Sequence, residues 1–303
     1  MQLTGPVAFI GSGLMGTPMI KRLLGAGFAV RVWNRTASKL AEVVAAGAVA
    51  SPTISEACDG AQAVCTCLSN ANAVEQVVFG AQGIVAAARP PAMLVDFSTI
   101  GPVATRAYSA RLAVACGTAW VDAPVSGGPT GAAAGKLVIF CGGDSNDIER
   151  ARALFDAMAQ RVTHFGATGN GQAAKVCNQV IVAVSLTAIA ESLNLAEAMS
   201  LDPLQLVEAL TGGYADSIPL QIFGRRMAER AFEPKLGDLA LMAKDLSLAT
   251  QLAADRGSTP PVLTAAARVY AAAAERGFAN ADLGELIDLT AAIARGADGA
   301  HLR

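Results

Sequence analysis

The chain has 303 residues, enough for two domains, and 53% of them are apolar while only 5% are aromatic. Its formal net charge of -2 gives no electrostatic basis for binding nucleic acid or an anionic membrane. No uninterrupted apolar run reaches about 18 residues, and the first residues lack the basic segment and cleavage site of a secretion signal. We therefore expect a cytoplasmic protein that binds neither nucleic acid nor membrane.

Six cysteines are scattered along the chain, and no group of Cys and His residues has the spacing of a zinc site. We expect reduced, buried thiols and no bound metal. The two histidines, His164 and His301, are isolated in the sequence, which favours structural or surface roles.

A strand, a glycine-rich turn and a helix open the first half. The apolar run Val7–Ile10 predicts a strand, and a helix is expected over Pro18–Ala26, before a second strand at Val30–Trp33. In such a unit the first glycine of the turn permits its tight bend, the second lets the backbone approach a pyrophosphate, and the third packs helix against strand. The residues predicted to bind a dinucleotide here are Gly11, Gly13, Leu14, Met15 and Gly16.

The end of the second strand indicates which dinucleotide binds. Asn34, Arg35 and Thr36 stand where NAD-binding proteins usually place Asp or Glu against the ribose 2′-hydroxyl. A guanidinium instead fits a 2′-phosphate through paired hydrogen bonds, and Lys39 follows one turn later. We expect NADP(H) to be preferred; if Arg35 is only a surface residue, NAD(H) also binds.

Further strands and helices alternate up to about residue 141. The expected strands are Ala63–Leu68, Met93–Phe97, Trp120–Ala123 and Leu137–Cys141, and the expected helices are Ile54–Cys58, Ala73–Val78 and Val103–Val114. Parallel strands place their binding loops at their carboxyl ends. Leu68 and Ser69 are therefore expected near the ribose and pyrophosphate, and Thr99 near the nicotinamide.

The loop Ser126-Gly127-Gly128 has the composition of an anion site. It offers a hydroxyl and consecutive backbone N–H groups that no side chain obstructs, and a substrate carboxylate is the expected ligand for them. Taken alone, the loop is explained somewhat better as a simple Pro- and Gly-rich connector. Asp122, just before it, is expected to cap or brace the loop rather than to act as an acid.

The second half predicts helices alone. A long helix over Gln172–Met199 comes first, and a glycine-rich stretch precedes it. The later helices are expected at Pro203–Leu210, Pro219–Arg230, Leu236–Asp255, Val262–Arg276 and Leu283–Arg295. The fold class is thus an α/β Rossmann-type dinucleotide-binding domain over residues 1–167, followed by an all-α domain over 168–303. We expect the long helix to bridge the domains and to support a homodimer or homotetramer.

Lys175 lies near the start of the long helix. At 3.6 residues per turn, Lys175, Asn178 and Gln179 share one face. No carboxylate is close in sequence, so burial would lower the pKa of the lysine towards neutrality and make it a proton donor and acceptor. An isolated lysine at a helix start is more often solvated, and the other motifs argue against that interpretation here.

Four segments in order resemble the β-hydroxyacid dehydrogenase family, and the resemblance covers nearly the whole chain. They are Gly11–Gly16, Asp122–Gly128, Gly169–Gln179 and Lys244-Asp245-Leu246. The resemblance implies that Lys175 is the catalytic acid/base and that Asn178 orients it and the substrate. It also implies that Ser126, Gly127 and Gly128 hold the substrate carboxylate, with Gln179 as a further substrate contact. Lys244 would reach the cofactor or close the cleft, and Asp245 would support its helix.

One segment departs from the family pattern. Leu236-Gly237 stands where reductases of this family often have Gly-Phe, so the pocket is either wider or filled by Phe223 or Phe232. The segment from Lys175 to Ala183 looks most like the tartronate semialdehyde reductases, whereas Asn34-Arg35-Thr36 looks like the glyoxylate and succinic semialdehyde reductases. The two segments point to different branches, so the sequence does not determine which of their substrates this protein uses.

The resemblance implies an NAD(P)-dependent oxidoreductase that interconverts a short 3-hydroxy acid and its semialdehyde. The alternatives are an imine reductase on the same fold and a non-catalytic NADP-binding protein. A lysine at position 175 favours a carbonyl over an imine substrate, because related imine reductases typically lack it. Lys175 together with the Ser126–Gly128 loop counts against a pure binding protein.

Overall fold

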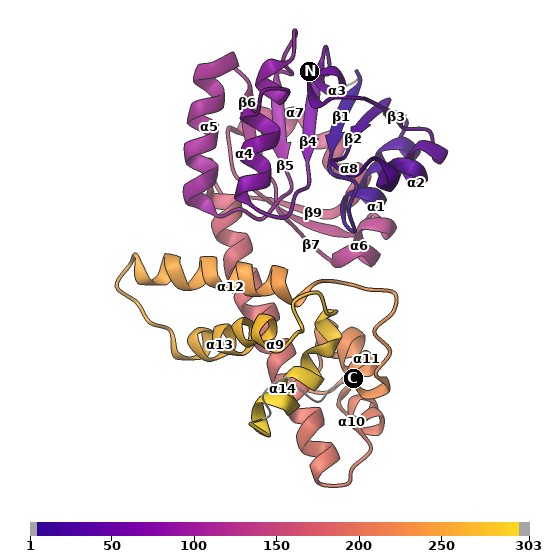
Figure 1. Cartoon of the computed structure of the whole chain (residues 1–303), viewed down its shortest axis with the longest axis vertical. Helices are drawn as coiled ribbons and strands as arrows, with labels where there is room; N and C mark the ends of the chain where they lie inside the picture. Colours follow the sequence, from indigo (N-terminus) through magenta and orange to yellow (C-terminus); the bar gives the residue numbers. More distant parts are fainter. Residues whose placement is uncertain (1–4, 297–303) are drawn as a thin grey trace. The chain divides into compact units, whose positions relative to one another are not determined.

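The computed structural model describes residues 5–296 (Figure 1). The chain divides between Lys175 and Val176 into two compact units. This division falls inside the long helix α9 (Asn170–Ala198), whereas the sequence places it at residues 167 and 168, before that helix. The first turn of α9 is hydrogen-bonded to the N-terminal unit, which explains why the division lies within the helix.

The N-terminal unit is built on a six-stranded parallel sheet in the order β3-β2-β1-β4-β5-β6. Its strands are β1 (Val7–Ile10), β2 (Val30–Trp33), β3 (Val49–Ala50), β4 (Ala63–Thr66), β5 (Met93–Asp96) and β6 (Ala119–Asp122). The strand order reverses between β1 and β4, the position where such sheets bind dinucleotides beyond the carboxyl ends of the strands. The predicted Rossmann architecture is therefore confirmed.

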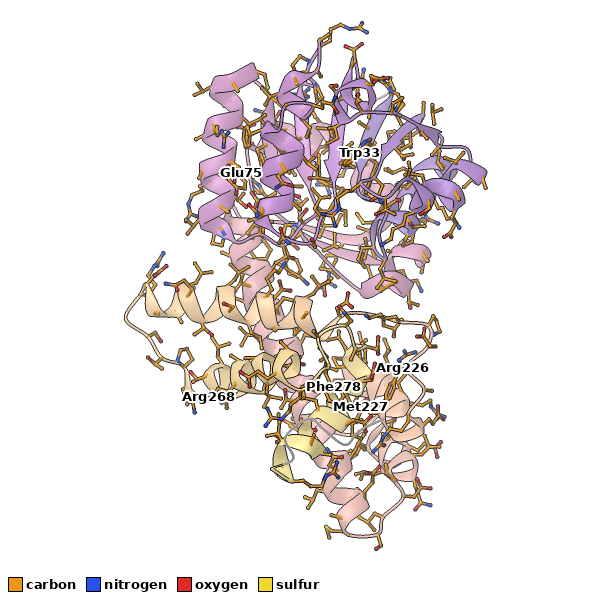
Figure 2. All side chains as sticks on the ribbon, viewed as in Figure 1. Trp33, Glu75, Arg226, Met227, Arg268 and Phe278 are labelled. Carbon is orange, nitrogen blue, oxygen red and sulfur yellow. The ribbon has the colours of Figure 1, made fainter. Side chains whose placement is uncertain are left out.

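Both faces of this sheet are buried along its central strands β1, β4 and β5. Along β1, Val7 and Phe9 join one apolar cluster while Ala8 and Ile10 join another, as expected for a parallel sheet with helices on both sides. The helical elements of this part are α1 (Gly16–Gly25), η1 (Ala37–Leu40), α2 (Ala41–Ala45), α3 (Ile54–Cys58), α4 (Ala71–Phe79), η2 (Ile84–Ala86) and α5 (Pro102–Cys116). Glu75 on α4, labelled in Figure 2, binds Arg111 on α5 at 2.8 Å.

A second, three-stranded sheet completes the N-terminal unit. It contains β7 (Val125–Ser126), β8 (Leu137–Cys141) and β9 (Ala159–His164), and the helices around it are α6 (Gly128–Ala134), α7 (Ser145–Arg150) and α8 (Arg152–Met158). The strand β9 escapes sequence prediction because it is polar and largely solvent-facing. His164 at its end has Nε2 at 2.8 Å from the Gly166 carbonyl oxygen, a structural contact; His301 lies outside the described residues.

The C-terminal unit is helical over its described part. Its elements after α9 are α10 (Pro203–Leu210), η3 (Leu220–Gly224), α11 (Arg225–Glu229), α12 (Leu239–Ala254), α13 (Pro261–Glu275), η4 (Leu283–Glu285) and α14 (Leu286–Ala294). Helices α12 and α13 lie side by side (Figure 1). The predicted helix over Pro219–Arg230 contains a π-helical turn, η3, and ends where Arg230 adopts φ 52°. Met227 on α11 is fully buried in the core of this unit (Figure 2).

Helix α9 is long and apolar enough to cross a membrane by length and composition, which a count of uninterrupted apolar residues does not register. Five of its apolar residues are buried in the core of the helical unit: Val176, Ala183, Leu186, Ala190 and Leu193. Packing in this core accounts for the apolar face of the helix.

The six cysteines are free thiols. Cys58, Cys65 and Cys141 are buried as expected, and burial raises the pKa of the Cys58 and Cys141 thiols to about 12. The expectation of burial is wrong for Cys177, which is exposed because it lies on the outward side of α9, between the buried positions Val176 and Gln179.

Candidate active site

The glycines of the β1–α1 turn serve two different purposes. Gly11 has φ 104°, and a Cβ there would lie 2.4 Å from the Cys67 carbonyl oxygen. A Cβ on Gly16 would lie 1.9 Å from the Gly11 carbonyl oxygen. These two positions therefore exclude any side chain for reasons internal to the fold.

Gly13 differs, because a Cβ at this position would meet nothing within 4 Å. The space in front of the turn is therefore open, as the approach of a pyrophosphate to the backbone at a helix N-terminus requires. In the same turn, Leu14 is 45% exposed and Met15 is half-buried. These residues fit a dinucleotide, and their individual contacts with it stay predictions.

The residues after β2 divide between structure and recognition. The Ser12 N–H donates to Asn34 Oδ1 at 3.1 Å, and Asn34 Nδ2 donates to the Thr36 carbonyl oxygen at 2.9 Å. The Asn34 side chain thus braces the glycine turn. Arg35 and Thr36 are exposed beside it.

The loops after β4 and β5 are bonded to one another. The Leu68 N–H donates to Ser98 Oγ at 2.9 Å, and the Ser98 N–H donates to Asp96 Oδ1 at 3.0 Å. Thr66 Oγ1 donates to the same Asp96 oxygen at 2.8 Å. These bonds hold two predicted cofactor loops together, with Ser69 exposed and Thr99 half-buried at their tips.

Asp96 is fully buried, and its Oδ2 has no hydrogen-bond partner among the residues that the structure describes. Burial raises the pKa of this carboxyl from 3.8 to about 6, against the opposing hydrogen bonds from Ser98 and Thr66. The nearby Asp122 adds a smaller increase of the same sign. Asp96 is thus a buried acid at the carboxyl end of the sheet, and sequence reasoning did not single it out.

Asp122 holds the start of α9. Its Oδ1 accepts the Gly169 N–H at 2.7 Å and its Oδ2 accepts the Gln172 N–H at 3.0 Å. These bonds confirm that Asp122 is a brace, although it braces the start of α9 rather than the loop that follows it. Desolvation raises the pKa of its carboxyl, and the backbone N–H bonds oppose that effect.

Gln172 joins the same region from α9. Its Nε2 donates to the Ser98 carbonyl oxygen at 2.7 Å, and its Oε1 accepts the N–H groups of Ile100 and Gly101 at 3.0 and 3.1 Å. The residue is fully buried. Sequence reasoning missed it; the available signal was an amide in the first turn of an apolar helix.

Lys175 follows Gln172 by three residues on α9 and is only 6% exposed. The solvated alternative for this lysine is therefore wrong. Because the division between the units falls after it, Lys175 belongs to the same unit as the nucleotide-binding loops. Its catalytic role stays a prediction at this point.

Beyond Lys175 the polar face of α9 continues into the helical unit. Asn178 Nδ2 donates to Gln179 Oε1 at 3.0 Å, and Gln179 Nε2 donates to Asp245 Oδ2 at 2.6 Å. Lys244 Nζ lies 3.1 Å from Asp245 Oδ1. The nearly buried Asp245 therefore ties α9 to α12, the supporting role expected of it.

The predicted carboxylate loop begins α6. Gly127 and Gly128 adopt φ 128° and 63°, a conformation that favours glycine, and a Cβ on Gly128 would meet nothing within 4 Å. The first N–H groups of a helix have no acceptor within it. With the half-buried Ser126 beside them, these groups fit an anion such as a carboxylate.

Gly237 is closely packed. A Cβ there would lie 2.7 Å from Leu283 Cδ1, so a larger side chain would require Leu283 to move. Phe223 and Phe232 are half-buried and pack against the core of the helical unit. At this departure from the family pattern, the Leu283 side chain occupies the space next to Gly237. Whether either phenylalanine fills the pocket stays a prediction.

Among residues 5–296, no group of three or more His, Cys, Asp or Glu side chains is arranged to hold a metal ion.

Two family models match the chain. The NAD binding domain of 6-phosphogluconate dehydrogenase matches residues 6–166, and the NAD-binding domain of NADP-dependent 3-hydroxyisobutyrate dehydrogenase matches residues 169–290. Together they span both units.

Three relatives define the family more closely. The 2-hydroxy-3-oxopropionate reductase of Escherichia coli is 38% identical over 82% of this chain and 84% of its own. The NAD-dependent L-serine dehydrogenase of Pseudomonas aeruginosa is 36% identical over 91% of this chain and 94% of its own. The structure of Mycobacterium tuberculosis 3-hydroxyisobutyrate dehydrogenase with L-serine has a TM-score of 0.81 at 35% identity, covering 96% and 99% of the two chains.

The chain belongs to the β-hydroxyacid dehydrogenase family. It is accordingly an NAD(P)-dependent hydroxyacid dehydrogenase or reductase, and the alternative of a non-catalytic binding protein is set aside. The cofactor is a nicotinamide dinucleotide, held by a Rossmann-type unit whose loops fit it.

The two kinds of glycine in the β1–α1 turn predict two different losses. Gly13→Ala should fold normally and weaken cofactor binding about 10-fold or more, because its Cβ projects into the open space before the turn. Gly16→Ala should lower thermal stability, because its Cβ would clash with the Gly11 carbonyl. Thermal melts and cofactor titrations check both. Normal cofactor affinity in folded Gly13→Ala would contradict the assignment of the turn.

The buried Asp96 predicts a pH-dependent stability. Since its pKa is raised from 3.8 to about 6 in the folded state, the folded protein holds a proton that the unfolded chain releases between these values. Stability from this group is therefore lost as pH rises from about 4 to 6. The free energy of unfolding of Asp96→Asn, taken relative to that of wild type, should increase by about 1–3 kcal/mol over that range and stay constant above it. A difference constant from pH 4 to 8 would contradict this.

Proposed function

We propose that the protein interconverts a short 3-hydroxy acid and its semialdehyde, with NADP(H) preferred over NAD(H). The observation that carries the proposal is the burial of Lys175 on the helix that Asp122 and Gln172 attach to the nucleotide-binding loops. The relatives support the substrate class, since 2-hydroxy-3-oxopropionate, L-serine and 3-hydroxyisobutyrate each bear an oxygen on the carbon two bonds from the carboxylate carbon.

In this proposal the N–H groups and hydroxyl at Ser126–Gly128 bind the substrate carboxylate and so orient its carbonyl carbon. The bound nicotinamide would supply hydride to that carbon during reduction and accept it during oxidation. As negative charge grows on the carbonyl oxygen, the Lys175 ammonium donates a proton to it and forms the hydroxyl group. In oxidation the neutral amine accepts the hydroxyl proton instead. A positioned proton donor typically contributes about 10²–10⁴-fold to the rate.

Asn178 would orient Lys175 and the substrate from the next turn of the helix, with Gln179 as a further substrate contact. The bonds from Asn178 to Gln179 and from Gln179 to Asp245 restrict both amides and so support these roles. Lys244, paired with Asp245, would reach the cofactor.

The proposed preference for NADP(H) rests on the end of β2. The side chain that follows the strand, Asn34, is engaged by Ser12 and Thr36. Recognition of the ribose 2′ position therefore falls to Arg35, which is exposed and suits a phosphate.

Cytoplasmic location and a homodimer or homotetramer stay predictions. Helix α9 supports self-association, because Ile181 and Leu195 on it are 69 and 61% exposed, and Met199, which follows its last residue, is 64% exposed.

The catalytic role of Lys175 is tested by initial rates with NADPH and NADH against 2-hydroxy-3-oxopropionate, methylmalonate semialdehyde, succinic semialdehyde and glyoxylate, with L-serine and 3-hydroxyisobutyrate in reverse. We expect turnover on a 3-oxo acid and a loss of about 10²–10⁴-fold in Lys175→Met, with NADPH affinity nearly unchanged. Lys21→Met, which removes an exposed lysine on α1, is the control. Equal loss of turnover and NADPH affinity in Lys175→Met would mean that the lysine is structural.

The role of Arg35 is tested by comparing the two cofactors. Arg35→Ala should raise KM for NADPH about 10–100-fold, the value of a hydrogen bond to a charged group, and leave KM for NADH within about 3-fold. Arg268→Ala makes the same change of charge at an exposed position of α13 (Figure 2) and should alter neither KM. Parallel weakening of both cofactors by Arg35→Ala would refute the 2′-phosphate role.

A further inference from the structure

Thr99 is flanked on both sides by backbone groups that one side chain binds. The Ser98 carbonyl before it accepts from Gln172 Nε2, and the Ile100 and Gly101 N–H groups after it donate to Gln172 Oε1. We propose that Gln172 is a positioning residue of the reaction, which fixes the Thr99 loop against the turn of α9 that carries Lys175. The inference rests on the proposed function, in which Thr99 lies at the nicotinamide and Lys175 transfers the proton.

The chemistry of the side chain suits this task. An amide offers donors on nitrogen and two acceptor lone pairs on oxygen, and Gln172 uses both kinds at once. Its three side-chain bonds, of 2.7 to 3.1 Å, lie in a fully buried position where water cannot replace them. A glutamate keeps the acceptors but loses the donor, and a methionine of similar length loses both.

The backbone of Gln172 is fixed independently of its side chain. Asp122, at the end of β6, accepts the Gln172 N–H and also the Gly169 N–H. The first turn of α9 is therefore anchored to the sheet, and the side chain extends this anchor to the loop after β5. Without the side chain the helix would keep its attachment to β6, while the Thr99 loop would lose its bonds to α9.

The connection continues in both directions. Lys175 follows Gln172 by three residues, about 4.5 Å along the helix axis, so both lie on neighbouring turns of one rigid element. In the other direction, Ser98 Oγ accepts the Leu68 N–H. One network of hydrogen bonds thus relates the loops after β4 and β5 to the helix turn that carries the proton-transferring lysine. An error of 1 Å in such an alignment is enough to cost about 10²-fold in rate.

The test compares Gln172→Met with wild type. We expect kcat to fall about 10–100-fold, KM for the nicotinamide cofactor to stay within about 3-fold, and the primary deuterium isotope effect on hydride transfer to rise, because misalignment slows the hydride step. Gln172→Glu, which keeps the acceptor for Ile100 and Gly101, should change these quantities in the same direction and serves if the methionine variant does not fold.

Asn194→Leu is the matched control. Asn194 lies on the same helix, and its Nδ2 donates to the Ile287 carbonyl oxygen and to Thr290 Oγ1, each at 2.9 Å. Its replacement also removes amide hydrogen bonds from α9, but 22 residues from Gln172, which is about 33 Å along the helix. It should lower Tm and leave kcat and the isotope effect unchanged. Equal kinetic effects of Gln172→Met and Asn194→Leu would overturn the inference.

Amide hydrogen exchange separates this inference from the substrate assignment. If wild type reduces no member of the substrate panel, the proposed substrate class fails. Amide exchange still tests whether Gln172 holds the Thr99 loop, because the Ile100 and Gly101 N–H groups donate to its side chain. They should exchange faster in Gln172→Met and not in Asn194→Leu, and unchanged exchange over residues 98–101 would overturn the inference.

Discussion

The attachment of α9 to the carboxyl end of the sheet is the constraint on which the rest of the candidate site depends. Asp122 binds two N–H groups at the start of this helix, those of Gly169 and Gln172, and the helix carries Lys175 three residues after Gln172. Unsatisfied N–H groups at a buried helix start would be costly, and a carboxylate satisfies them with charge-assisted bonds that also favour the helix dipole. A catalytic lysine on this helix is therefore held in a fixed position relative to the sheet.

This arrangement places two carboxyl groups side by side in the protein interior. Asp96 and Asp122 are register partners on β5 and β6, and desolvation raises the pKa of both. The two carboxyl groups differ in the hydrogen bonds that offset their desolvation. Asp122 accepts backbone N–H bonds on both oxygens, whereas one oxygen of Asp96 has no partner among the described residues. Burying Asp96 costs free energy, but its other oxygen accepts hydrogen bonds from the Ser98 N–H and the Thr66 hydroxyl and so holds both residues in place. Buried polar groups that hold loops in this way commonly accompany binding sites.

The nucleotide-binding loops show a similar separation of structural and recognition roles. Gly11 and Gly16 serve the close approach of backbone to backbone, and Asn34 serves the turn between them. Gly13 and Arg35 face open space or solvent. A motif of contiguous residues thus contains two classes of position, which only the surrounding packing distinguishes.

Local pattern determined much of this protein from the sequence alone: the β1–turn–α1 unit, the succession of helices after residue 170 and the shared face of Lys175 and Asn178. These features depend on neighbours within a few residues, whose periodicity and backbone preferences are written in consecutive positions. Tertiary structure alone decided that Gln172 binds a loop more than 70 residues away, that one oxygen of the buried Asp96 has no partner among the described residues, and that Gly237 packs on Leu283. Each of these depends on groups brought together by the fold, and neither composition nor spacing records which distant side chain will fill a given space.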